Sequence, residues 1–481
     1  MKMLKRNYIK LTGVPSARAG IRQLKRCAYS FWATIFICLI TISANAQVIT
    51  TIAGNGIAGY IGNGGPSTAA ELSDPFDIAL DSAGNIYIAD AGNNVIRKIN
   101  TAGIITTIAG GGMLFYNGMR ATDVQLNNPL SIAFDHSGNL FVNDNGNNCI
   151  RKIDTAGIIY NVAGNGTTGY SGDSAQATGA QLYDPQGIAL DNAGNLYIAD
   201  YSNSVVRKVD PAGIITTVAG NGASGNSGDE SAATAASLTG PTNVMLDNSG
   251  NLIIADGGAS VIRKVNSAGI ITKVAGVGYR DYSGDGGQAT NAGLDFPRSL
   301  AIDASGNLFI ADWWNNVIRK IDPTGIITTV AGNGYGSGMG AGAFAGDSGL
   351  ATAAEMFDPS AVVVDNAGNI FIVDEENERI RKVTPDLAGV KLLISPLTYI
   401  TLFPNPNTGS FTLNTTQTEN ESLAITITNI LGQVVYVKEE SAQQGNTNTQ
   451  IKLSDALPNG IYLLYINGAD ENETVKFEIN K

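Results

Sequence analysis

Short apolar runs alternate with glycine-rich turns over most of the chain, and the same order of runs returns six times between residues 74 and 383. In the third copy the runs are GIALD (187–191), LYIAD (196–200), VVRKVD (205–210) and IITTVAG (214–220). The first two runs are apolar at nearly every position, which indicates strands covered on both faces. Gly194 lies in the turn between them, where the backbone needs the freedom of glycine. Each copy is therefore predicted to be a sheet of four strands.

A proline opens the first strand of every copy and marks the period of the repeat. Successive prolines lie 54, 56, 56, 56 and 62 residues apart, at Pro75, Pro129, Pro185, Pro241, Pro297 and Pro359. A period of this size means stacked units that bury their apolar faces against each other. A ring of such sheets is a β-propeller. The predicted fold class is all-β, with a six-bladed β-propeller over residues 47–384.

The beginning and the end of the repeat array complement each other. The sixth copy stops after its third strand, at Val383, whereas VITTIAG (48–54) repeats the fourth strand with no copy in front of it. We predict that residues 48–54 pair with the third strand of the sixth copy and close the ring. Closure removes the exposed sheet edges of an open array.

The repeat resembles a known family. DPFDIALDSAGNIYIADAGNNVIRKINTAGIITTIAG (74–110) is similar to the NHL repeat, and the later copies follow the same order of residues. The resemblance implies a propeller whose turns between second and third strands share one face with the connections between copies. Loops on such a face vary while the blades hold them, so this face is the expected ligand side.

The last 80 or so residues show no repeat and have another composition. LFPNPNTGSFTLNT (402–415), ITITNILGQVVY (425–436), LPNGIYLLYI (457–466) and KFEIN (476–480) resemble a type A sorting domain of the type IX secretion system. Alternating apolar positions in ITITN and a returning VVYV predict a small antiparallel β-sandwich over 399–481, after a linker at 385–398. The resemblance implies passage across an outer membrane, with the secretion machinery as the partner of residues 402–481.

The first 46 residues are predicted to be a secretory signal. Eight basic residues precede the apolar run FWATIFICLITI (31–42), and ANA (44–46) offers small residues for cleavage near Ala46. No other apolar run is longer, so no transmembrane span is expected. Cleavage changes the count of basic and acidic residues from 30 − 42 = −12 to 22 − 42 = −20. So acidic a chain repels nucleic acid, and we expect a secreted or surface-attached protein, a monomer, with Cys149 as a free, buried thiol.

Three features repeat in most copies and are predicted to be structural. An Asp ends every second strand (Asp90, Asp144, Asp200, Asp256, Asp312 and Asp374), and an Arg-Lys pair lies in every third strand, from Arg97-Lys98 to Arg381-Lys382. A residue present in every blade serves the blade, here by binding turn N–H groups or the Arg. Four connections carry a Gly-Asp phrase, as in GYSGD (169–173). One Asp per loop is too few for a calcium site, so glycine-rich packing over the blade is expected.

The irregular positions are the better candidates for a ligand site. Two residues follow each Asp in the turn, and those of three copies are large or charged: Tyr201, Trp313, Trp314, Glu375 and Glu376. Exposed aromatic rings flanked by polar groups suit stacking on sugar rings or anchoring a peptide. The competing interpretation is that one Trp covers a neighbouring blade edge. We expect these five residues to bind a glycan or a peptide.

Three functions are compatible with the sequence. The leading prediction is a binding propeller with no catalytic residue, no metal site and no cofactor. The alternative is a calcium-dependent lactonase or hydrolase, for which Asp77 and Asn243, just after two of the prolines, are the only acidic and amide hints. The third is a structural role in a matrix or in adhesion. The one histidine, His136, lies in a turn on the opposite face and cannot supply a zinc site alone.

Overall fold

The computed structural model describes residues 47–114, 116–384, 399–403, 408–417, 421–429, 433–442, 445–454, 456–467 and 472–479. These residues contain strands and short 3₁₀ helices but no α-helix. The signal peptide expected at 1–46 and the linker expected at 385–398 lie outside the described residues.

Residues 48–384 form six antiparallel sheets, which we number as blades 1 to 6 in chain order. Each of the first five blades is built from consecutive strands. Blade 1 is β2 (Pro75–Leu80), β3 (Ile86–Asp90), β4 (Val95–Ile99) and β5 (Ile105–Gly110); blade 2 is β7 (Pro129–Phe134), β8 (Leu140–Asp144), β9 (Cys149–Ile153) and β10 (Ile158–Ala163); blade 3 is β12 (Pro185–Leu190), β13 (Leu196–Asp200), β14 (Val205–Val209) and β15 (Ile214–Ala219). Blade 4 is β17 (Pro241–Leu246), β18 (Leu252–Asp256), β19 (Val261–Val265) and β20 (Ile270–Ala275); blade 5 is β21 (Pro297–Ile302), β22 (Leu308–Asp312), β23 (Val317–Ile321) and β24 (Ile327–Ala331).

Short elements lie in the connections. Two-residue strands add a fifth, outermost strand to blades 2, 3 and 4: β6 (Met119–Arg120), β11 (Ala175–Gln176) and β16 (Ser231–Ala232). One set of 3₁₀ helices follows the fourth strands: η1 (Ser67–Ala69), η2 (Ala121–Asp123), η4 (Ala177–Gly179), η6 (Ala233–Ala235), η8 (Ala289–Asn291) and η10 (Ala351–Ala353). The other set follows the second strands of blades 2 to 6: η3 (Asn145–Asn147), η5 (Tyr201–Asn203), η7 (Gly257–Ala259), η9 (Trp313–Asn315) and η11 (Glu375–Asn377).

Blade 6 joins the two ends of this region. Its strands are β25 (Pro359–Val364), β26 (Ile370–Asp374), β27 (Arg379–Thr384) and β1 (Val48–Ala53), and β1 pairs antiparallel with β27. Ile49 of β1 is fully buried in the core shared by blades 5 and 6, and Ala53 in the core shared by blades 6 and 1. The predicted closing strand is therefore confirmed.

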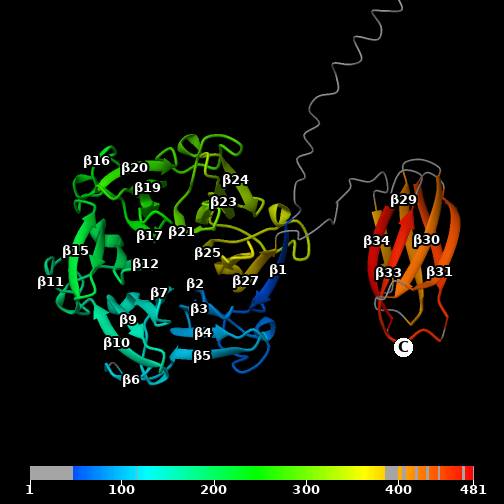
Figure 1. The fold of residues 1–481 in the computed structure, drawn as a ribbon, viewed down its shortest axis with the longest axis horizontal. Helices are drawn as coiled ribbons and strands as arrows, with labels where there is room; N and C mark the ends of the chain where they lie inside the picture. The colour runs from blue at the N-terminus through cyan, green and yellow to red at the C-terminus, as the bar shows by residue number, and fades with distance from the viewer. Residues whose placement is uncertain are drawn as a thin grey trace, which may run out of the picture. The chain divides into compact units, whose positions relative to one another are not determined.

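The first strands of the blades surround a common centre (Figure 1). Each contacts its two neighbours around the circle, in the order β2, β7, β12, β17, β21, β25 and back to β2. The apolar faces of adjacent blades pack together, which explains why the first two strands of every copy are apolar on both sides. The fold is a β-propeller, and residues at the start of each first strand lie at the mouth of its channel.

The C-terminal residues form two more sheets. One holds β28 (Tyr399–Phe403), β29 (Ser410–Gln417) and β32 (Gly445–Lys452); the other holds β30 (Glu421–Asn429), β31 (Val434–Ala442), β33 (Gly460–Asn467) and β34 (Asn472–Ile479). Buried residues of both sheets share one core, among them Phe411, Ile425 and Phe477. This is the antiparallel sandwich that the alternation of apolar residues predicts.

Candidate functional site at the channel mouth

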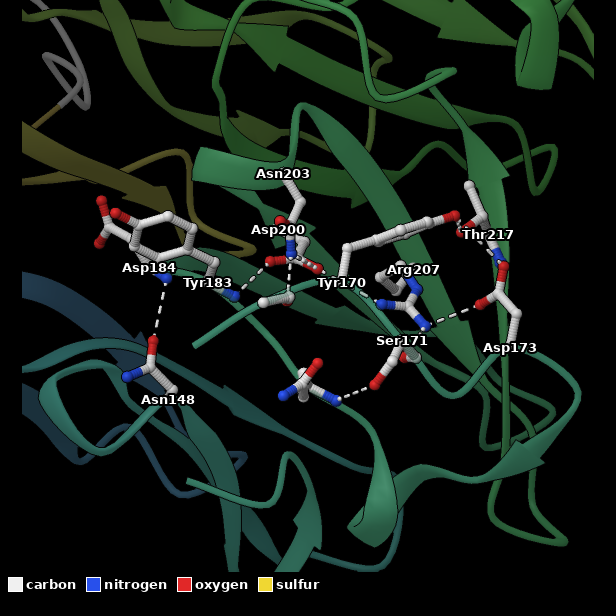
Figure 2. Close-up of polar contacts among 12 residues, drawn as sticks. Asn148, Tyr170, Ser171, Asp173, Tyr183, Asp184, Asp200, Asn203, Arg207 and Thr217 are labelled. Carbon is white, nitrogen blue, oxygen red and sulfur yellow. Dashed lines mark hydrogen bonds and ion pairs between the residues drawn. The ribbon is translucent and has the colours of Figure 1, made fainter. Parts of the chain in front are cut away.

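The Asp at the end of each second strand is a structural group. In blade 3, Asp200 Oδ1 accepts the backbone N–H of Tyr183 at 2.8 Å, and Asp200 Oδ2 lies 3.4 Å from Arg207 Nη1 (Figure 2). Both side chains are fully buried, and burial raises the pKa of Asp200 to about 6. Equivalent ion pairs occur in the other five blades. The predicted structural role is therefore confirmed, since a buried Asp–Arg pair fixes each turn to its blade.

The Asp of the Gly-Asp phrase also belongs to this network. Asp173 Oδ1 accepts from Arg207 Nη2 at 2.7 Å, and Asp173 Oδ2 accepts the N–H of Thr217 at 3.2 Å (Figure 2). Asp229, Asp285 and Asp347 bind the arginines of blades 4, 5 and 6 in the same way. Glycine-rich packing was the expectation, but the phrase has a more specific role, because it brings a carboxylate onto the buried Arg.

Other residues that the sequence singled out have ordinary surroundings. Cys149 is buried, and burial raises the pKa of its thiol to about 12. The carboxylate of Asp77 accepts from the Ser131 hydroxyl and from the N–H of Ile132, both at 2.9 Å, so it links blade 1 to blade 2. His136 is exposed. Among the described residues, no group of three or more His, Cys, Asp or Glu is placed to hold a metal ion.

The residue before each proline marks the channel mouth and has an unusual backbone. All six have positive φ, between 46° and 62°: Asp74, Asn128, Asp184, Gly240, Phe296 and Asp358. Asp, Asn and Gly tolerate this left-handed region, but a Phe is strained in it. Such strain persists only where the surroundings over-determine it, and it concentrates at functional sites. Phe296, at φ 53°, is therefore the strained residue among these six, and it lies at the start of blade 5.

Phe296 lies within a cluster of aromatic rings. Its centroid is 5.5 Å from that of Trp313, 5.2 Å from Trp314 and 6.4 Å from Tyr201. Trp313 and Trp314 stack at 5.2 Å with 24° between their planes. Tyr201 of blade 3 covers Gly240 of blade 4, where a Cβ would meet the ring at 2.6 Å. Three of the five predicted site residues are thus brought together, around a Phe that the sequence reasoning missed.

Two arginines complete the stack of rings. The guanidinium carbon of Arg280 is 4.0 Å from the Trp314 ring centroid, and that of Arg298 is 4.1 Å from Trp313 and 4.0 Å from Phe76. The indole rings are half-buried between each other and these cations. The sequence predicted exposed rings, and this part of the prediction is wrong. Because both indole rings pack against arginines, their faces are not free to stack on a sugar ring.

Arg298 has few partners of its own. It is half-buried, and its pKa is lowered by burial and raised by the charges of Glu375 and Asp358. No hydrogen bond or salt bridge joins it to a described residue, and its Nε is fully enclosed without a partner. The two Nη atoms are not fully enclosed. A guanidinium that contacts two aromatic rings and has donors unused can bind an acceptor group.

Glu375 is the acidic counterpart of Arg298. Its side chain is nine-tenths buried, its Oε2 has no hydrogen-bond partner, and burial raises its pKa to about 7 despite Arg298. Burial also raises the pKa of Asp358 to about 6. Glu376, the fifth predicted residue, is exposed and makes no such contact. Trp313 Nε1 is a further enclosed donor without a partner. The mouth therefore holds unpaired donors and an unpaired acceptor side by side.

A pocket of about 690 Å³ lies beside Trp314. Its walls include Arg280, Asp281, Asp295 and the loop at Ser337 and Gly338. Asp295 is buried; its Oδ1 makes no hydrogen bond but lies 3.6 Å from Arg280 Nε, and burial raises its pKa. The pocket adjoins the aromatic cluster through Trp314.

The comparisons with known proteins agree with this architecture. The family model for the secretion system C-terminal sorting domain matches residues 401–480, and the model for the teneurin NHL domain matches residues 42–117, 166–227 and 278–341. Human teneurin-1 is 26% identical over 389 residues, covering 72% of this chain, and Drosophila melanogaster teneurin-m is 27% identical over 350 residues, covering 66%. The chain spans 13% and 12% of their lengths.

Solved structures share the fold at low identity. An auxiliary nutrient binding protein from Bacteroides thetaiotaomicron superimposes with a TM-score of 0.51 at 18% identity, covering 70% of this chain and 76% of that one. A protein of the same description from Bacteroides ovatus gives 0.51 at 15% identity, covering 71% and 77%.

Fold and repeat together define the class of protein: this is a β-propeller, and three stretches of its repeat array are similar to the teneurin NHL domain. At its C-terminus the chain carries a sorting domain of the type IX secretion system. The sorting domain marks the protein for export to the medium or the outer cell surface, and it implies contact with that secretion machinery. No helix of the described residues is long and apolar enough to cross a membrane.

Proposed function

We propose that this protein is an exported binding protein whose propeller takes a saccharide at the channel mouth between blades 5, 6 and 1. We also propose that the propeller spans residues 47–384, that the sorting domain spans residues 399–481, and that the signal peptide is cleaved near Ala46. The auxiliary nutrient binding proteins of similar fold support a binding role.

One observation carries the proposal: Arg298, Trp313 and Glu375 each have an enclosed polar atom without a partner, and they lie on the same rim. Buried polar groups are normally paired, because an unpaired one costs about 1–3 kcal/mol. A sugar hydroxyl both donates and accepts, so neighbouring hydroxyls can serve the carboxyl of Glu375 and the Arg298 Nη atoms, which are not fully enclosed, together.

A saccharide suits the mouth better than an extended peptide does. A peptide that adds to a sheet edge needs an accessible row of free backbone groups, whereas each first strand, although it is an edge strand, lies against its two neighbours around the channel. Tyr201 and Glu376 lie farther out on the rim and extend the surface that a larger saccharide can touch.

The test is binding of the purified protein to an array of glycans and peptides, followed by calorimetry with the best ligand. We expect a glycan, and at least tenfold weaker binding by the Arg298→Gln variant. Lys320→Gln is the matched control, because it removes one positive charge from the outer part of the same blade. Equal affinity of Arg298→Gln and the parent would contradict the site, and a peptide as the sole ligand would contradict the saccharide.

A further inference from the structure

Blade 2 differs from blades 3, 4, 5 and 6, its sister blades in this comparison, at the buried Arg. In blades 3, 4, 5 and 6 the Nη2 atom of this Arg donates to a loop carbonyl at 3.0–3.1 Å and to a loop Asp at 2.7–2.8 Å. Arg151 of blade 2 makes one hydrogen bond, from Nε to Asp144 at 3.2 Å. Its side chain is only 6% exposed, yet neither Nη atom has a partner among the described residues.

The loop of blade 2 lacks the Gly-Asp phrase, and Asn117 stands where blades 3 to 6 have Asp; blade 1 has Asn63 at the same position, where its Oδ1 accepts the N–H of Thr107. Asn117 Oδ1 accepts the N–H of Asn161 at 2.8 Å, just as Asp173 Oδ2 accepts the N–H of Thr217 in blade 3. Because Oδ1 of Asn117 makes this bond, Nδ2 of Asn117 takes the position from which the second Asp oxygen faces the Arg in blades 3 to 6. The Asn117 Nδ2 and the Arg151 guanidinium are both donors, whereas blades 3 to 6 pair an Arg donor with an Asp acceptor at this position.

A second side chain has lost its loop partner. In blades 1, 3, 5 and 6 the Asn three residues after the Asp donates both to that Asp and to a loop carbonyl, the latter at 2.7–2.9 Å. Asn147 of blade 2 donates to Asp144 and to no other residue that the structure describes. Among the residues that the structure describes, no aromatic ring covers Arg151, whereas Tyr60, Tyr170, Tyr282 and Phe344 cover the arginines of blades 1, 3, 5 and 6.

The missing groups leave a pocket of about 470 Å³ over Arg151. Asn117, Asn147, Asn161 and Thr178 contribute to its walls, with glycines between them, and Arg151 is the charged residue among those that line it. A pocket that holds the Nη atoms of one guanidinium and the Nδ2 donor of Asn117, with no carboxylate among its lining residues, attracts an oxyanion.

We propose that this pocket binds a ligand carboxylate, which takes the position that the protein's own Asp occupies in the sister blades. The sister geometry supplies the template: a carboxylate oxygen 2.7–2.8 Å from Nη2 of the Arg. The volume exceeds that of a bare carboxylate, and the amide and hydroxyl walls suit the hydroxyls of a uronic acid. This site is in blade 2 and is independent of the saccharide site at the channel mouth.

The test is calorimetry of the purified protein with three probes: galacturonate, galactose and acetate. We expect galacturonate to bind and galactose, which lacks the carboxylate, to bind at least tenfold more weakly. Acetate distinguishes a site for any carboxylate from one that also needs the sugar ring; binding of either acid supports the proposal. No binding of galacturonate or acetate, or equal binding of galactose, would overturn it.

Asn117→Asp is the decisive variant, because it rebuilds the carboxylate of the sister blades. We expect it to bind galacturonate at least tenfold more weakly than the parent, while its melting temperature stays equal or rises. Arg151→Lys keeps the charge but loses the fork of donors, and we expect a similar loss of binding. Asp173→Asn in blade 3, where Tyr170 still covers the Arg, is a control that leaves galacturonate binding unchanged. Full binding by Asn117→Asp, or by a folded Arg151→Lys, would refute the assignment.

Discussion

Arg298 of β21 lies over the ring of Phe76 of β2, with 4.0 Å between the guanidinium carbon and the ring centroid. The two residues belong to blades 5 and 1, which blade 6 separates along the ring. The Arg side chain therefore reaches across the mouth of the channel. Its cation lies close enough to the buried carboxyl of Glu375 to lower the pKa of that group against the effect of burial.

Tryptophan fluorescence should report on this pair directly. Trp313 and Trp314 are the tryptophans that remain once residues 1–46 are removed, and Arg298 contacts Trp313. We expect a fluorescence transition near pH 7, where Glu375 titrates with a pKa of about 7. Arg298→Gln should move it to higher pH, because the Arg charge lowers the pKa of Glu375. A transition that persists in Glu375→Gln would show that another group, such as Asp358, causes it.

The same carboxyl should make stability depend on pH. Burial raises the pKa of Glu375 from its usual 4.5 to about 7, so the folded protein holds this proton more tightly than the unfolded chain does. The contribution of this carboxyl to the free energy of unfolding is therefore greatest below pH 4.5. It falls between pH 4.5 and about pH 7 and is constant above that, and the total loss is about 3 kcal/mol.

The Glu375→Gln variant should lack this pH-dependent loss of stability, because a Gln side chain does not titrate. Denaturant melts of parent and variant at several pH values should show their difference in unfolding free energy growing by about 3 kcal/mol in favour of the variant between pH 4.5 and pH 8. A difference that stays constant with pH would mean that Glu375 is solvated or paired in solution.

The repeat made much of the fold predictable, because every periodic residue has the same role in every blade. The pairing of Asp200 with Arg207 and the closure by residues 48–54 follow from counting strands and matching positions. The sandwich core at the C-terminus follows from the alternation of apolar residues.

The site was only partly predictable, because it depends on contacts between blades far apart in sequence. Nothing near Arg298 in the chain reveals that Phe76, more than two hundred residues earlier, covers it. Glu375 lies in a turn that looks exposed, yet the ring geometry buries it. Phe296 could have been found: aligning the residue before each proline shows Asp, Asn or Gly in the other five copies.

Replacing Trp313 by Ala should now cost stability as well as binding. The ring is half-buried and contacts Trp314, Phe296 and Arg298, so its removal leaves a gap and an uncovered guanidinium. We expect a loss of about 2–3 kcal/mol in unfolding free energy, somewhat below the 3–5 kcal/mol of a core Trp. Trp313→Phe keeps a ring and removes the unpaired Nε1 donor, so its stability should match the parent's. Equal melting of Trp313→Ala and the parent would show the ring to be exposed.

The closing strand offers a matched pair of substitutions. Ile49 is fully buried between blades 5 and 6, whereas its neighbour Val48 is 36% exposed. Ile49→Ala should lower the unfolding free energy by about 2–5 kcal/mol, and Val48→Ala by less than about 0.5 kcal/mol. Deleting residues 48–53 should expose the edge of β27 and cause aggregation. Closure does not contribute to stability if Ile49→Ala unfolds at the same denaturant concentration as Val48→Ala.

Removal of the sorting domain should separate export from folding. The blades of residues 48–384 have their own cores, and the sheets of residues 399–479 share another. A chain truncated before residue 399 should therefore fold with the melting temperature of the parent propeller but remain in the periplasm, because it lacks the signal that the type IX machinery reads. Cell fractionation and melting of the recovered protein measure the two properties separately. As the reciprocal control, residues 385–481 joined to an unrelated periplasmic protein should send that protein to the medium or the cell surface. Export of the truncated chain at parental levels would show that the signal lies elsewhere in the protein.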